Sequence, residues 1–221
     1  MYVPPIYRTA DRSWLLGIVD ANPLAVLVTV VDGRPVASHV PVIVDADRRD
    51  GDDDLVLLGH MNRVNPQWKA IGAGCDALVV FTGPHGYVSP TVYGFTPAAP
   101  TWNFTAVHAA GRLTPLPPGR PTLAVIMATV TALEGRFGAA WDPAGSLGYF
   151  DELLPAVGAF TVRAERIDTM RKLSQEQRPQ TRAAVAESFG RDRGDGPALA
   201  ELMRACLAET SGTVALEGEL S

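Results

Sequence analysis

The stretch LAVLVTVVDGRPVASHVPVIV, residues 24–44, decides the fold that the sequence predicts. Residues 24–31 are a run rich in β-branched side chains, which is typical of a buried strand. Asp32-Gly33 is a hairpin turn signal, and residues 36–44 alternate in part, as expected of a returning strand. The stretch therefore predicts an antiparallel β-hairpin.

Further elements are predicted on both sides of this hairpin. Strands are predicted over residues 55–61, 77–81, 87–89, 104–113 and 158–167, with Gly83-Pro84 ending the strand 77–81. Helices are predicted over residues 11–21, 122–137, 147–154 and, in two pieces, 179–208, and Asn65-Pro66 is a helix start. Closely spaced strands followed by helices favour an antiparallel barrel with helices packed outside, and not a doubly wound parallel sheet.

Composition bounds the class of protein. The 221 residues are 47% hydrophobic and 19% charged, which is enough for one domain with a real core. Acidic residues outnumber basic ones by 24 to 19, and a net charge of −5 argues against DNA contact over a broad surface. Residues 45–54 hold six aspartates and are predicted to form a solvated loop.

The sequence also limits the cellular location of the protein and the bonds that its cysteines could form. Cys75 and Cys206 lie far apart and form no CxxC pair, so neither a disulfide framework nor a zinc knuckle is suggested. The first residues do not read as a signal peptide, and no apolar run is long enough for a membrane span. We therefore expect a cytoplasmic protein that does not contact membranes.

Several familiar catalytic and nucleotide-binding motifs are absent from the sequence. It has no GxGxxG after a strand, no GxxxxGK[ST], no GxSxG and no HExxH. The four histidines, His39, His60, His85 and His108, each lie in or beside a predicted strand. Either each one packs and bonds a neighbour, or strand-borne histidines converge on one pocket. Their spacing does not favour a zinc site.

Three polar segments could bind a ligand. In residues 59–68 a strand leads into a helix start, so His60 and Arg63 with backbone N–H groups could hold a phosphate, although a plain turn would look the same. In residues 100–108, Trp102 and Asn103 could stack on and bond to a flat heterocycle, or be a core aromatic and a turn asparagine.

The third segment, residues 171–175, follows the last predicted strand. It combines a cation, a hydroxyl and an amide, as a phosphate or a carbonyl-rich ring would require, or it is a solvent-facing strand end. Together the three segments predict only that the chain binds a planar, phosphorylated ligand.

A series of short motifs resembles one family. The motifs occur in the family's order from residue 1 to about residue 190: Met1-Tyr2-Val3-Pro4, Ser38-His39-Val40-Pro41, Gly59-His60-Met61, Asn65-Pro66-Gln67-Trp68, Gly83-Pro84-His85, Val88-Ser89-Pro90, Pro100-Thr101-Trp102-Asn103-Phe104, Val107-His108 and Lys172-Leu173-Ser174-Gln175. In these motifs the chain resembles the bacterial FMN-binding negative transcriptional regulators, or PaiB-like proteins.

This resemblance implies a fold, a cofactor and a partner. The fold is α+β, a mainly antiparallel split β-barrel related to pyridoxamine phosphate oxidases, here over residues 1–175 with a helical extension over 176–221. The cofactor is FMN, bound between the subunits of a homodimer. The residues that the resemblance places at FMN are Ser38, His39, His60, Met61, Arg63, Asn65, Trp102, Asn103, His108, Lys172, Ser174 and Gln175.

The resemblance also divides these contacts and shows two departures. It implies phosphate contacts from His60, Arg63, Asn65 and Lys172, and ring contacts from Trp102, Asn103 and Gln175. Glu176 stands where the family commonly has Asn, and an acid there would repel a phosphate. Val92 stands where the family often has an aromatic residue, which would widen the pocket.

Three functions remain open at this point. The first is a flavin-dependent oxidoreductase that acts on a small molecule, with no catalytic residue identified, although His39, His60 or His108 could move a proton near neutral pH. The second is a transcriptional regulator that acts through a ligand or a partner protein. The third is a flavin-free split barrel that binds another planar group such as haem, with a strand histidine as axial ligand.

Overall fold

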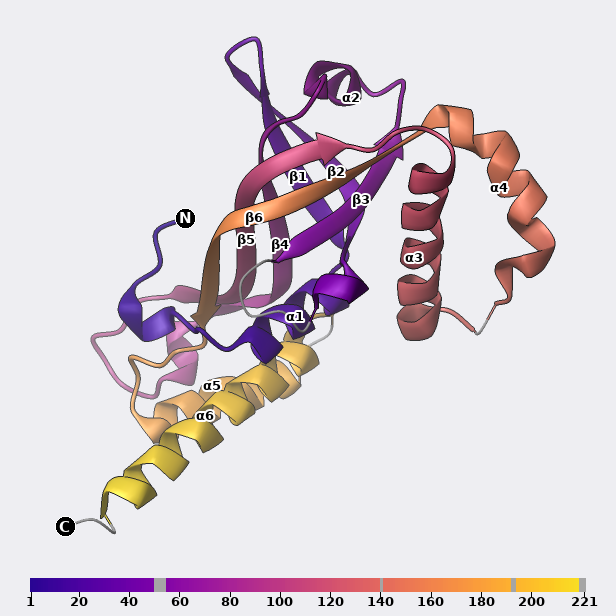
Figure 1. Cartoon of the computed structure of the whole chain (residues 1–221). Coiled ribbons are helices and arrows are strands. Elements are labelled where there is room, and N and C mark those ends of the chain that lie inside the picture. The colour runs from indigo at the N-terminus through magenta and orange to yellow at the C-terminus, as the bar shows by residue number, and fades with distance from the viewer. Residues whose placement is uncertain (50–54, 140, 192–193, 219–221) are drawn as a thin grey trace. The chain divides into compact units, whose positions relative to one another are not determined.

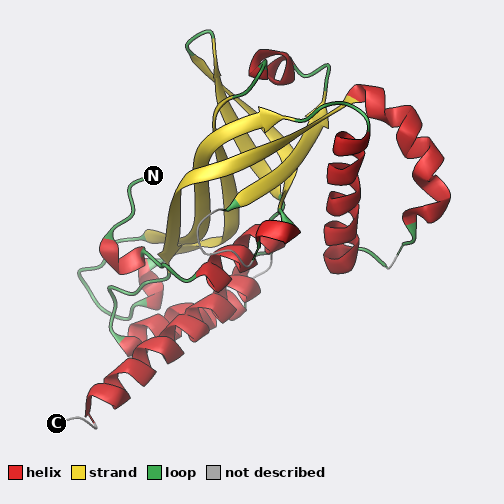
Figure 2. Ribbon diagram, in the orientation of Figure 1, coloured by secondary structure: helices red, strands yellow, loops and turns green. Residues whose placement is uncertain are grey.

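The computed structural model describes residues 1–49, 55–139, 141–191 and 194–218 (Figures 1 and 2). It forms two compact units. The barrel unit comprises Arg12–Phe81 and Val107–Ile167. The helical unit comprises Met1–Asp11, Thr82–Ala106 and Asp168–Ser221. The predicted division at residue 175 stays a prediction, and the predicted aspartate loop of residues 45–54 lies partly outside the described residues.

Among the described residues, six strands form a closed barrel in the order β1-β2-β3-β6-β5-β4. Their bounds are Leu24–Val31 for β1, Arg34–Val44 for β2, Val56–Asn62 for β3, Cys75–Val88 for β4, Thr101–Pro115 for β5 and Val157–Lys172 for β6. The pairs β1–β2, β1–β4, β2–β3 and β3–β6 are antiparallel. The predicted α+β fold with a mainly antiparallel barrel is confirmed.

The hairpin that opens the barrel forms as predicted. Asp32 and Gly33 have φ of 49° and 74°, the left-handed conformation that a tight two-residue turn requires. The turn sets the register Val31 to Arg34, which places Ser38 opposite Leu27 and His39 opposite Val26. Ala25, Leu27 and Thr29 are buried in alternation, which is the pattern of a strand with one face in the core.

Two predicted strand ends are wrong. β4 continues through Gly83-Pro84 to Val88, so the predicted strands 77–81 and 87–89 are one strand. A proline removes one N–H donor but tolerates extended backbone, and it does not by itself end a strand. β6 likewise continues beyond residue 167 to Lys172, so Arg171 and Lys172 lie inside the strand and not after it.

Four helices belong to the barrel unit. They are α1 (Arg12–Ala21), α2 (Pro66–Ile71), α3 (Arg120–Phe137) and α4 (Leu147–Leu153). α1 buries Leu15, Ile18 and Val19 on one face, as its periodicity predicts. α1, α2 and α3 contact strands of the barrel, so helices cover its outside. Short 3₁₀ turns complete the connections at Pro5–Tyr7, Ala46–Arg48, Pro90–Val92, Pro143–Ser146 and Leu154–Ala156.

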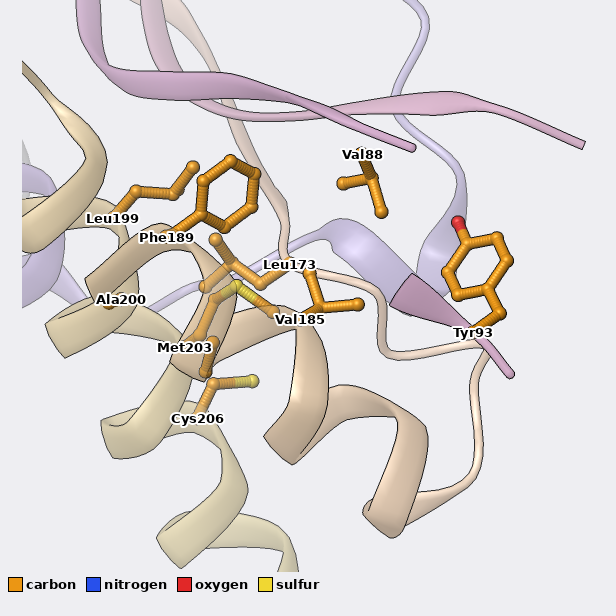
Figure 3. Close-up of a cluster of buried hydrophobic side chains, with 10 residues drawn as sticks. Val88, Tyr93, Leu173, Val185, Phe189, Leu199, Ala200, Met203 and Cys206 are labelled. Atoms are coloured by element: carbon orange, nitrogen blue, oxygen red, sulfur yellow. The ribbon is translucent and has the colours of Figure 1, made fainter. Parts of the chain in front are cut away.

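The helical unit contains α5 (Pro179–Gly190) and α6 (Gly196–Gly218), which pack against each other. Their shared core, shown in Figure 3, includes Val185, Phe189, Leu199 and Met203. A Cβ on Gly86 would lie 2.4 Å from the Phe189 ring, so β4 approaches this core closely. Within the described parts of the chain, no helix is both long and apolar enough to cross a membrane.

Candidate functional site

A cavity of about 520 Å³ opens in the barrel unit where β2, β3 and the start of β6 meet. This volume falls in the range of small-molecule sites, about 300–1,000 Å³. The residues that line it are His39, Val40, Pro41, His60, Met61, Asn62, Asn65, Leu153, Ala156 and Val157. The structure therefore brings together four of the predicted site residues: His39, His60, Met61 and Asn65.

Strand register explains why these residues meet. Val42 on β2 pairs with Gly59 on β3, which places the segments 39–41 and 60–62 at the same end of the pair. On its other side β3 pairs with β6, with Asn62 opposite Val157. Gly59 permits this arrangement, because a Cβ there would lie 2.5 Å from the Phe160 ring.

His60 is the central ionisable group of the cavity. Its Nδ1 is buried and has no hydrogen-bond partner among the described residues. Burial lowers the pKa of the imidazole below its usual 6.5. The ring is therefore neutral at pH 7. A neutral imidazole can donate or accept one hydrogen bond without placing a charge in the cavity.

Arg63 is anchored by Ala156 and by Val157, the first residue of β6, both of which line this cavity. Its backbone N–H donates to the carbonyl oxygen of Ala156 at 2.8 Å, and its Nε donates to that of Val157 at 2.9 Å. Its guanidinium also lies over the Trp68 ring, 5.8 Å from the centroid. Among the described residues, no acceptor binds its two terminal amino groups, so they can bind an anion.

Asn65 lines the cavity but its side chain is occupied. Its Nδ2 donates to Ser38 Oγ at 2.9 Å, and its Oδ1 accepts the N–H of Gln67 at 2.9 Å and so caps α2. The cap predicted for Asn65 is confirmed. Because Asn65 already satisfies that N–H, the start of α2 has one donor fewer for the predicted phosphate.

Sequence reasoning gave Gln67 no role, yet it supports this site. It is fully buried, and its Nε2 donates to Leu27 O at 3.1 Å, Thr29 Oγ1 at 3.0 Å and Val36 O at 3.2 Å. These bonds fasten α2 to β1 and β2, and hence hold Asn65 and Ser38 in place. Sequence reasoning also missed Leu153, Ala156 and Val157, which line the cavity from segments distant in sequence.

Of the remaining predicted residues, Asn103, Ser174 and Gln175 lie in the helical unit, where their side chains make hydrogen bonds within that unit. Asn103 and Ser174 are fully buried, with Asn103 Nδ2 at 2.9 Å from Ser174 Oγ and the hydroxyl donating to Asn103 Oδ1 at 3.2 Å. Gln175 accepts from the N–H of Leu173 at 2.7 Å and donates to Arg171 O. A cofactor contact from Asn103, Ser174 or Gln175 would have to replace these bonds.

Lys172 and Trp102 are more accessible members of the helical unit. Lys172 Nζ donates to Thr101 Oγ1 at 2.6 Å and lies 5.9 Å from the Tyr7 ring centroid. Trp102 is 48% exposed and has the rings of His85 and Tyr87 at 5.9 and 6.0 Å. These three rings form an exposed aromatic group.

The two departures from the family pattern have structural roles in the helical unit. Glu176 accepts a hydrogen bond from Tyr7 Oη at 2.9 Å. Burial and this carboxylate together raise the pKa of Tyr7 to about 12. Val92 packs against the core between α5 and α6.

The four histidines do not form one group within either unit. His39 and His60 line the same cavity, whereas His108 is half-buried on β5 of the barrel unit and His85 belongs to the helical unit. In the described ranges, no three His, Cys, Asp or Glu side chains lie close enough to hold a metal ion.

Comparison with known proteins identifies a family whose model matches the chain and a relative that covers most of its length. It matches the family model described as "Putative FMN-binding domain" over residues 1–166. The protein named "Protease synthase and sporulation protein PAI 2" of Bacillus subtilis (strain 168) is 30% identical to it over 207 residues, which cover 92% of this chain and 96% of that protein.

Two solved structures share the fold at low identity. The FAD and haem binding protein from Mycobacterium smegmatis aligns with a TM-score of 0.54 and 18% identity, over 75% of this chain and 73% of that one. The flavocytochrome Anf3 from Azotobacter vinelandii aligns with a TM-score of 0.53 and 15% identity, over 75% and 69%. At these identities the similarity shows the fold alone.

Proposed function

This chain belongs to the FMN-binding domain family, and from that premise we propose that it binds FMN in the cavity between β2 and β3 and is a flavin-dependent oxidoreductase. The observation that carries the proposal is the meeting of His39, His60 and Met61 at one cavity. Arg63 does not line the cavity, but its Nε donates to the carbonyl oxygen of Val157, which does. When bound, the flavin would supply the electron transfer.

The cavity suits a flat ring that ends in a phosphate. Val40, Pro41, Met61 and Val157 give it apolar walls, and the neutral imidazole of His60 supplies a single polar contact. Arg63 supplies the positive charge that a phosphate requires, because its orientation is already fixed by its bonds to β6 and its contact with Trp68.

The first test identifies the bound molecule. We expect the purified full-length protein to release FMN on denaturation, recognised by its mass and its flavin absorbance. Release of haem, with a Soret band, would replace this proposal by the haem alternative. If FMN is neither released nor bound when added to the purified protein, the proposal is wrong.

The second test removes the proposed phosphate contact. Arg63→Ala should weaken FMN binding about tenfold to a hundredfold, since a charge-assisted hydrogen bond contributes about 1.5–3 kcal/mol. Lys69→Ala is the matched control, because it removes an exposed cation of α2 that does not line the cavity. Equal affinities in the two variants, measured by fluorescence titration, would place the phosphate elsewhere. Lys172→Ala tests the second predicted phosphate contact in the same assay.

A regulatory role is the second candidate, supported by the resemblance of the motifs to those of the FMN-binding negative transcriptional regulators. The net charge of −5 favours regulation through a ligand or a partner protein over direct DNA contact. A gel-shift assay at physiological salt tests this, and we expect no shift of promoter DNA by the protein alone.

A further inference from the structure

A second, smaller cavity of about 270 Å³ lies between α3 and the barrel. Its helical wall consists of five residues at positions i, i+3, i+4, i+7 and i+8 of α3, which form one face of a helix. They are Ile126, Thr129, Val130, Leu133 and Glu134. Pro41 of β2 and His60 of β3 form the opposite wall, and Trp141 completes the lining.

This face of α3 is apolar but incompletely packed. Thr122, Val125 and Thr129 are buried, whereas Ile126, Val130 and Leu133 are only partly buried. The Thr129 hydroxyl donates to the carbonyl oxygen of Val125 at 2.8 Å, so this donor is already satisfied and needs no hydrogen bond from a ligand. An apolar stripe that faces the barrel and leaves space provides a hydrophobic surface for a small molecule.

The side chains that line this cavity include one negative charge and no Lys or Arg. Glu134 carries that charge. Its Oε2 accepts the backbone N–H of Trp141 at 3.3 Å, and among the described residues no donor binds its Oε1. His60 is neutral at pH 7 because burial lowers its pKa, so it does not repel a cation. The Trp141 ring adds an aromatic surface, which attracts cations.

We propose that this cavity binds a small apolar primary amine, with its hydrocarbon body against Ile126, Val130 and Leu133 and its ammonium group at Glu134 beside Trp141. An anion of the same shape would face the carboxylate, and a neutral analogue would lack the ionic contact. The amine is therefore favoured by charge and by shape together.

The site differs from the proposed FMN cavity in all but two of its lining residues, Pro41 and His60. Amine binding can be measured with or without flavin on the protein. Failure of the amine proposal and failure of the FMN proposal are therefore separate results.

The experiment compares three probes that share one body. Isothermal titration calorimetry of the full-length protein at pH 7 measures 2-phenylethylamine, 2-phenylethanol and 3-phenylpropanoate. We expect the amine to bind about tenfold more tightly than the alcohol, and the anion to bind more weakly than the alcohol. Glu134→Gln should bring the affinity of the amine down to that of the alcohol and leave the alcohol unchanged.

Glu152→Gln is the matched control, because Glu152 is an exposed residue of α4 that does not line the cavity. It should keep the preference for the amine. The proposal is overturned if the wild-type protein binds the alcohol as tightly as the amine, if none of the three probes binds, or if Glu134→Gln retains the preference. The comparison of probes on the wild-type protein decides the matter even where a variant does not fold.

Discussion

His60 illustrates how the surroundings of one side chain set its chemistry. The ring lines two cavities, its Nδ1 is buried without a partner, and burial lowers its pKa. Protonation would place an uncompensated charge in a poorly hydrated position. The folded protein therefore holds this imidazole neutral, as a hydrogen-bonding group and not as a cation.

A dependence of stability on pH follows from His60. Unfolded, this histidine titrates near 6.5, and in the folded protein it titrates at lower pH. Between the two values the unfolded chain binds more protons, so the free energy of unfolding falls as the pH drops below about 6.5 and stops falling below the folded pKa. His60→Gln should lose less stability than the wild type between about pH 7.5 and 5 in urea unfolding.

The control for this experiment is His85→Gln, in which an exposed histidine is replaced. It should retain the wild-type loss of stability on acidification. If His60→Gln and the wild type lose equal stability over that range, the buried imidazole is not the group responsible.

Tyr7 and Glu176 give the opposite pH dependence at high pH. The pKa of Tyr7 is raised from 10.0 to about 12, first by burial and then by Glu176. Above about pH 10 the unfolded chain loses this proton more readily, so stability falls as the pH rises towards the folded pKa. In Glu176→Gln, ultraviolet titration of tyrosinate should show Tyr7 ionising at lower pH, though still above 10 because burial remains. Tyr7→Phe lacks the phenol, so the transition that is missing from its titration belongs to Tyr7. An unchanged titration in Glu176→Gln would contradict the assignment.

At the scale of elements, two glycines differ in how much space surrounds the position that a Cβ would occupy. A Cβ on Gly111 of β5 would lie 1.9 Å from the carbonyl oxygen of Arg163 on β6, and backbone cannot move aside as a side chain can. Gly135 of α3 has nothing within 4 Å of its Cβ position. The first glycine is therefore required by packing, and the second only lowers helix propensity.

Matched alanine substitutions test this difference. Gly111→Ala should lower the free energy of unfolding by about 3 kcal/mol or more, because strand backbones must separate. Gly135→Ala should raise it by about 0.5–1 kcal/mol. Both changes are measured by urea unfolding, and a mild effect at Gly111 would show that β5 and β6 accommodate the methyl group.

The elements differ in how far the sequence could predict them. The β1–β2 hairpin, α1 and the Asn65 cap follow from local signals, namely Asp32-Gly33, an apolar helical face and an asparagine before proline. The continuity of β4 through Gly83-Pro84 was not predicted, because a glycine followed by proline is a strong local turn signal.

The same contrast holds for the candidate site. The motif around His60 pointed to residues that do line a cavity, because strand register brings β2 and β3 together. The anchoring of Arg63 on Val157 of β6 joins residues 94 positions apart, and the mutual burial of Asn103 and Ser174 joins residues 71 positions apart. No local sequence pattern encodes such contacts. The predicted cofactor contacts of those residues stay predictions.

For the whole molecule, a homodimer is the state that we propose. His39 and Leu153 at the cavity are exposed in a single chain, and a second copy would shield a bound flavin there. We expect light scattering after size exclusion to give twice the mass of one chain. The mass of one chain at concentrations where FMN remains bound would contradict the proposal.

The helical unit is assembled from three separate stretches of chain, Met1–Asp11, Thr82–Ala106 and Asp168–Ser221, and the last two of these contain the ends of β4 and β6 and the start of β5. A single recombination breakpoint in the gene therefore cannot transfer this whole unit into a related protein. Its three pieces must be inherited along with the intervening barrel, and a chimaera that exchanges the unit needs three coordinated grafts.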